Sequence, residues 1–165
     1  QRGSAMGKQQ RITSWFQRLG IGGAIALLIG LLQGNLAYSQ TPTLTLSPQF
    51  SPNPMQLQGT GGGSQAIQSL IGRSESPIGP CTGYANKAPN HTITLRAFFN
   101  SLRVTVESAE DTALVIQGPG GTWCNDDTKG KNPEISGQWL PGKYDIWVTT
   151  YAKDKTASYT LKLFD

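Results

Sequence analysis

KYDIWVTTY, residues 143–151, is the stretch that decides the fold class. Tyr144, Ile146 and Val148 share one face of this stretch, and Trp147 lies on the other. A period of two residues is typical of a β-strand that packs one face against a core, because successive side chains of a strand point in opposite directions. The stretch therefore predicts a strand rather than a helix.

The same pattern recurs on both sides of this strand, in HTITLRAFF (91–99), LRVTVE (102–107) and SYTLKLF (158–164), and TALVIQ (112–117) is a short apolar run. Turn-forming Gly, Pro, Asn and Asp residues separate the stretches. Short strands at this spacing predict an all-β fold, an antiparallel β-sandwich or barrel. We expect MQLQGT (55–60) and SQAIQSLIG (64–72) to add one or two edge strands, and we expect no helix.

The amino-terminal part has the order of a secretory signal. Three cations, Lys8, Arg11 and Arg18, precede an apolar run at 19–32, and small residues follow at Ala37 and Ser39. This order predicts a signal peptide over 6–39 and a periplasmic or secreted protein. An uncleaved membrane anchor is the alternative, and the only membrane contact we expect, although 14 apolar residues fall short of the roughly 20 that span a bilayer. Residues 1–5 are interpreted as a cloning remnant or an over-extended gene start.

The net charge of +4 does not indicate a nucleic-acid partner. All of the excess comes from the amino-terminal 39 residues, because ten Lys or Arg and ten Asp or Glu follow from Gln40 onward. A phosphate-binding surface needs a cluster of cations on the folded domain. Residues 40–54 contain four prolines and no charge, which predicts an extended Pro-rich linker, and the domain is expected to span 55–165.

Both cysteines, Cys81 and Cys124, fall in the exported part. Export leads to an oxidising compartment, where paired cysteines persist as disulfides. The bond would close a loop of 43 residues, worth about 4 kcal/mol in the chain-entropy model. Free thiols or half of a metal site are the alternatives, but a zinc site needs about four ligands and the chain has one histidine.

The second half of the chain, from about Thr92 to Asp165, resembles the bacterial pre-peptidase C-terminal domain. The resemblance rests on an acid before a strand, a Gly-rich turn, an acidic loop, a P-G-x-Y strand and a closing Y-T-L strand. The matching residues are Asp111, Leu114, Val115, Asn132, Glu134, Pro141, Gly142, Tyr144, Tyr159 and Leu161. The resemblance implies a small jelly-roll-like β-sandwich of the kind attached to secreted proteases and other exported proteins.

The stretch from Gly118 to Trp139 is the candidate site, and calcium is its candidate cofactor. Calcium takes six to eight oxygen ligands from carboxylates, amides, backbone carbonyls and water. The stretch offers such oxygens at Asn125, Asp126, Asp127, Asn132 and Glu134, with Asp111 nearby in the strand order. The resemblance implies calcium as well, since related bacterial modules bind it. The alternative is a solvated turn in which Asn125 and Asp126 only hydrogen-bond the backbone.

Aromatic residues flank the same stretch and suggest a second kind of site. Trp123, Trp139, Trp147 and Tyr151 would form a platform on which sugar rings stack, if their side chains are exposed. Core packing, or cover for the disulfide, is the alternative interpretation.

Catalysis finds little support in the sequence. His91 is the only histidine and begins a strand, and no G-x-S-x-G motif accompanies it. We therefore expect an exported, non-catalytic binding module for a glycan or protein partner at the cell surface. The alternatives are a structural or adhesion subunit, and an accessory or inhibitor of a secreted protease.

Overall fold

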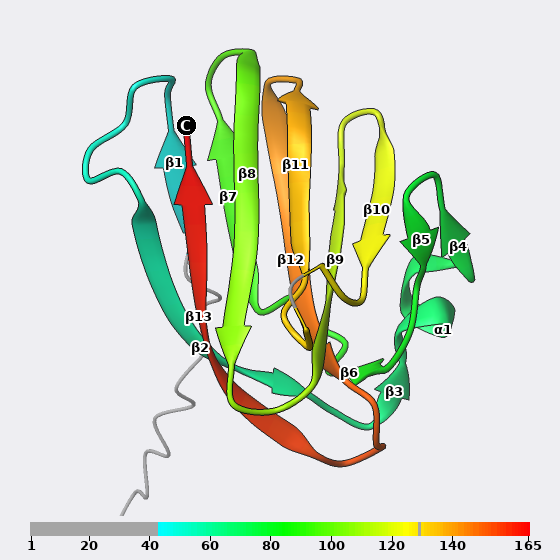
Figure 1. Cartoon of the computed structure of the whole chain (residues 1–165). Helices are drawn as coiled ribbons and strands as arrows, with labels where there is room; N and C mark the ends of the chain where they lie inside the picture. The colour runs from blue at the N-terminus through cyan, green and yellow to red at the C-terminus, as the bar shows by residue number, and fades with distance from the viewer. Residues whose placement is uncertain (1–42, 129) are drawn as a thin grey trace, which may run out of the picture. The chain divides into compact units, whose positions relative to one another are not determined.

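Two antiparallel sheets pack face to face in the computed structural model, which describes residues 43–128 and 130–165 (Figure 1). The larger sheet, sheet A, contains β1 (Thr43–Leu46), β3 (Gln65–Ala66), β6 (Tyr84–Ala85), β7 (His91–Leu95), β9 (Thr112–Gly118), β10 (Gly121–Asn125) and β12 (Gly142–Thr150). Sheet B has the order β11-β8-β13-β2, formed by β2 (Met55–Gly62), β8 (Phe99–Ser108), β11 (Glu134–Trp139) and β13 (Thr156–Phe164). The predicted all-β sandwich is confirmed.

The predicted strand at 143–151 lies inside sheet A, where β12 pairs with β7 on one side and with β9 on the other. Its inward residues Tyr144, Ile146 and Val148 are fully buried. The inward residues of the other strands meet them in one core, which includes Ile93, Leu95, Leu102, Val104, Val106, Leu114, Ile116, Tyr159, Leu161 and Leu163. Burying a side chain of this size contributes about 1.5–3 kcal/mol, so the alternating pattern accounts for the association of the sheets.

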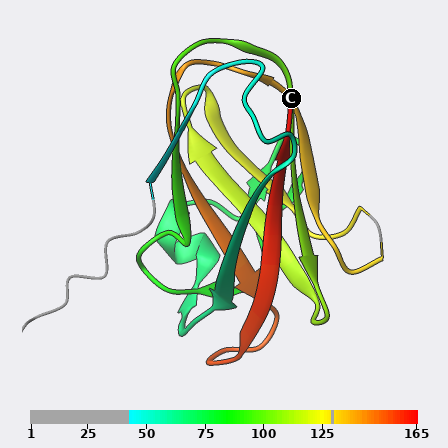
Figure 2. The same cartoon turned by 90° about the vertical axis from the view of Figure 1, so that its left-hand side faces the viewer.

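A second apolar layer covers the outer face of sheet A. It is formed by the single helix of the described residues, α1 (Ile67–Ile71), and the small hairpin of β4 (Glu75–Ser76) and β5 (Gly79–Pro80), which lie in the chain between strands β3 and β6 of sheet A. Figure 2 shows α1 on the side of sheet A that faces away from sheet B. Ile67 and Ile71 pack there against Val115 and Trp147, which point outward from β9 and β12.

The helix corrects the prediction for 64–72. Ile67, Leu70 and Ile71 are spaced as on one face of a helix, a signal too short to recognise between strands. Gly72 ends the helix in the left-handed conformation, with φ at 72°. The predicted disulfide is confirmed: Cys81 bonds to Cys124 of β10 and attaches this layer to sheet A.

The prediction of an extended linker at 40–54 is wrong for the residues that the structure describes. Residues 43–46 form β1, which pairs in parallel with β7, and Leu46 is buried in the core. Phe50 packs against Phe99. Asn53 bonds the backbone of Asp165 through both its amide nitrogen and its amide oxygen, which ties this segment to the last strand. The predicted signal at 6–39 lies outside the described residues.

Candidate functional site

The stretch from Gly118 to Trp139 is two strands and a short connection rather than one loop. β10 pairs antiparallel with β9, and β11 pairs with β8 of the other sheet. Residues 126–133 therefore cross from sheet A to sheet B. The short strands escaped prediction because Gly121 and Gly137 interrupt their apolar pattern.

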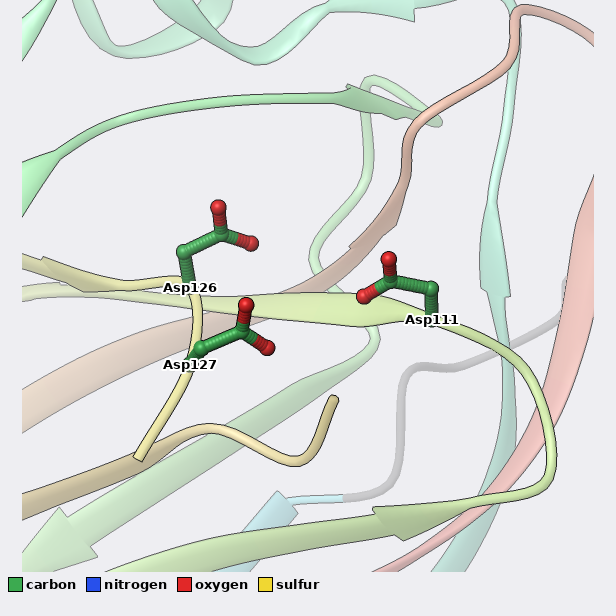
Figure 3. Close-up of side chains that lie close together, drawn as sticks. All are labelled: Asp111, Asp126 and Asp127. Carbon is green, nitrogen blue, oxygen red and sulfur yellow. The ribbon is translucent and has the colours of Figure 1, made fainter. Parts of the chain in front are cut away.

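Three aspartates meet where this connection begins (Figure 3). Asp126 and Asp127 follow β10, and Asp111 directly precedes β9. Because the two strands are antiparallel, with Asn125 opposite Leu114, the end of β10 lies beside the start of β9. One carboxylate oxygen from each aspartate lies within 4.8 Å of the others.

Tyr151 fixes the position of Asp126 in this cluster. Its hydroxyl group donates a hydrogen bond to Asp126 Oδ2. This bond, with burial and the neighbouring negative charges, raises the pKa of Tyr151 to about 12. The other oxygen, Asp126 Oδ1, is buried and has no hydrogen-bond partner among the described residues. A buried carboxylate oxygen without a partner is costly, and a bound cation would remove that cost.

Asp127 experiences the repulsion between the three acids. Desolvation, and then the charges of Asp126 and Asp111, raise the pKa of its carboxyl group above the ordinary value. The Asp127 side chain is exposed. A cation held by the three carboxylates would offset the repulsion between them, which is one of the causes of the raised pKa.

The other predicted calcium ligands have hydrogen-bond or ion-pair partners of their own. Asn125 Oδ1 accepts hydrogen bonds from the Thr128 hydroxyl (2.9 Å) and the Glu134 backbone N–H (3.0 Å), so this residue holds the turn. Asn132 Oδ1 accepts from the Ser108 N–H at 3.1 Å. Glu134 forms an ion pair with Arg103 at 3.9 Å. Asn125 therefore matches the alternative prediction of a hydrogen-bonded turn. Asp111 joins Asp126 and Asp127 in the carboxylate cluster.

The four predicted aromatic residues do not form one exposed platform. Trp139 packs against Tyr144 in the sandwich core, with ring centroids 5.0 Å apart, and donates its indole N–H to the Leu102 carbonyl. Trp147 is buried beneath the outer layer. Trp139 and Trp147 are 5% and 6% exposed, so the prediction of an exposed platform is wrong for both. Trp147 points away from the sandwich core, but it packs into the second apolar layer and does not face solvent. Trp123 is half-buried against Trp139, whereas Tyr151 is exposed and contacts the aspartates.

His91 has a structural position. It is buried between the sheets, and its Nε2 lies 2.8 Å from the Tyr159 hydroxyl oxygen. Burial lowers the pKa of the imidazole, so the ring is held neutral.

Comparison with known proteins leaves the function open. No protein-family model matches the chain. A protein of Synechococcus elongatus, described as uncharacterized, is 30% identical over 102 residues. The match covers 59% of this chain and 66% of that protein, slightly less than two thirds of its length.

Two solved structures are similar to this chain. One is the pre-peptidase C-terminal domain of a collagenase from Bacillus anthracis, with 11% identity over 75% of this chain and 96% of that one, at a TM-score of 0.45. The other is a mutant of a periplasmic inhibitor of g-type lysozyme from Escherichia coli, with 15% identity over 74% and 96%, at a TM-score of 0.37. The first bears the name of the family that the sequence resembles.

Among the described residues no helix has the length and apolar character needed to cross a membrane.

Proposed function

We propose that this protein is an exported, non-catalytic binding module for a glycan or protein partner, and that calcium bound by Asp111, Asp126 and Asp127 stabilises it. The main support for a bound cation is that three carboxylates from two separate segments lie close together. One of them, Asp126, has a buried oxygen with no hydrogen-bond partner among the described residues. Carboxylate oxygens are the ligands that calcium prefers, and backbone carbonyls and water would complete the coordination.

The position of the cluster supports a stabilising role. The aspartates join the start of β9 to the connection between β10 and β11, which runs from one sheet to the other. A cation held there would replace repulsion with attraction and fix the connection. The disulfide supports export, because such bonds persist in oxidising compartments.

Thermal unfolding of the oxidised protein tests the cation. We expect calcium to raise the melting temperature relative to protein in EDTA, by an amount equivalent to about 2.7 kcal/mol at a hundredfold excess over the dissociation constant. Asp126→Asn combined with Asp127→Asn should abolish the rise.

Glu110→Gln is the matched control, because Glu110 is an exposed neighbour of Asp111 outside the cluster. It should keep the full calcium response. An unchanged melting temperature of the wild-type protein at millimolar calcium would contradict the calcium site.

A further inference from the structure

A shallow polar trough crosses the outer face of sheet B. One hollow, of about 870 Å³, lies over β2, β13 and the end of β8. A second, of about 350 Å³, shares Glu107 and Asn132 with the first and continues to Phe164. Volumes in this range are those of small-molecule sites. The polar side chains of the larger hollow belong to Gln58, Thr60, Glu107, Asn132, Ser158 and Thr160.

Strand pairing sets these side chains in rows. Thr160 of β13 lies between Gln58 of β2 and Glu107 of β8, and Thr60 lies opposite Ser158 in a neighbouring row. Residues paired in this way across a sheet hold their side chains next to one another. The rows therefore present hydroxyl, amide and carboxylate groups on a rigid support, which lowers the cost of ordering a binding site.

Much of this hydrogen-bonding capacity is unused within the described part of the chain. The side chains of Gln58, Thr60 and Thr160 have no partner there. Asn132 engages its oxygen with the Ser108 N–H, which orients the side chain and leaves its amide N–H groups for a ligand. The hollow therefore presents both donors and acceptors, which a sugar hydroxyl group can use in either role.

The charges along the trough are paired with each other. Lys162 donates to Glu107 at 2.7 Å, and Arg103 lies 3.9 Å from Glu134. Arg103, Glu107 and Glu134, the charged residues that line the two hollows, are each engaged in one of these pairs, so the trough complements a neutral ligand better than a phosphate or an anionic polymer. At its far end the Arg103 guanidinium lies over the Phe164 ring, 4.2 Å from the centroid. Phe164 lines this end of the trough and offers apolar ring surface to the C–H groups of a sugar.

We infer that this trough binds a neutral oligosaccharide, with the hydroxyl and amide rows at one end and Phe164 at the other. The inference deepens the proposed binding role by naming the ligand class and its place, and it does not require calcium.

Amide chemical-shift titrations of the whole protein test the inference. The probes are cellohexaose, maltohexaose and chitohexaose, each added to about 10 mM and each run in EDTA and in calcium. One probe should shift amides of β2, β8 and β13 in a saturable way. Gln58→Ala combined with Thr160→Ala should weaken that binding about tenfold, because each lost hydrogen bond contributes about 0.5–1.5 kcal/mol.

The matched control is Gln65→Ala combined with Thr45→Ala, which removes the same two residue types from exposed positions of sheet A, outside the trough. It should change the affinity less than twofold. No saturable shift with any probe, or equal affinity in the Gln58/Thr160 variant, would overturn the inference. Sugar binding that persists in EDTA would support the trough even if calcium failed to stabilise the protein. Stabilisation by calcium without any sugar binding would support the cation site and overturn the trough.

Discussion

Neighbouring acidic and amide residues have different tasks in the connection that follows β10. Asn125 accepts two hydrogen bonds from its own turn and so fixes the backbone. Asp126 and Asp127, the next two residues, direct their carboxylates toward Asp111. The cation hypothesis therefore concerns the aspartates, because only they have oxygens that are close together and not fully engaged.

Asp127→Asn should stabilise the protein when calcium is absent, in a pH-dependent way. The pKa of Asp127 is raised in the folded state, so the folded protein binds this proton more tightly than the unfolded chain. Stability gained from protonation is present at low pH and is lost as pH rises from the ordinary carboxyl pKa through the raised one. The variant should melt higher than the wild type at about pH 7 and equally at about pH 3.

Melting curves in EDTA across this range measure the effect, with Glu110→Gln as the control. A difference that stays constant with pH would show that repulsion in the cluster does not act on stability. In calcium the order should reverse, because the variant loses a ligand.

At the scale of the element, the disulfide joins two layers. Cys124 belongs to β10 and faces outward in the same row as Val115 and Trp147. Cys81 belongs to the segment that carries α1. The bond therefore holds the outer layer of 67–81 on sheet A, while the sandwich core on the other side of the sheet has its own packing.

Replacing both cysteines with alanine should loosen the outer layer first. We expect a loss of about 2–5 kcal/mol, the usual effect of removing such a bond. Hydrogen exchange should accelerate in β3, α1 and β6 well before it does in β8 and β13. Mass spectrometry measures the exchange in each element. Equal acceleration of exchange in all five elements would contradict a separate role for the outer layer.

At the scale of the whole molecule, the two ends of the domain close on each other. β1 adds a parallel strand beside β7, and the segment after it reaches Asp165 through Asn53. β1 and β13, the first and last strands that the structure describes, thus belong to opposite sheets. The segment at 43–54 is part of the folded unit and carries core residues.

Leu46→Ala should destabilise the protein by about 2–4 kcal/mol, because Leu46 is 3% exposed in the sandwich core. Thr45→Ala, at an exposed position of the same strand, should change the free energy of unfolding by less than about 0.5 kcal/mol. Urea unfolding measures both. A negligible effect of Leu46→Ala would mean that the segment is a linker after all.

The strands with regular alternation could be predicted, and the features that depend on a second layer could not. Val115 and Trp147 have the parity of solvent-facing residues, yet both are buried, because α1 covers that face. TLTL at 43–46 lies beside prolines, and only pairing with β7 turns it into a strand. Asp126 and Asp127 were predicted as a pair, whereas their closeness to Asp111 depends on the β9–β10 register.

Local pattern by itself determined the sandwich, its five main strands and the disulfide, because apolar patterning and the pairing of two cysteines behind a predicted export signal depend little on distant residues. Tertiary structure alone decided which tryptophans are buried, which acids come together and where a polar trough forms. Each of these depends on segments far apart in the chain meeting in one register, and strand register is fixed by the packing of whole sheets.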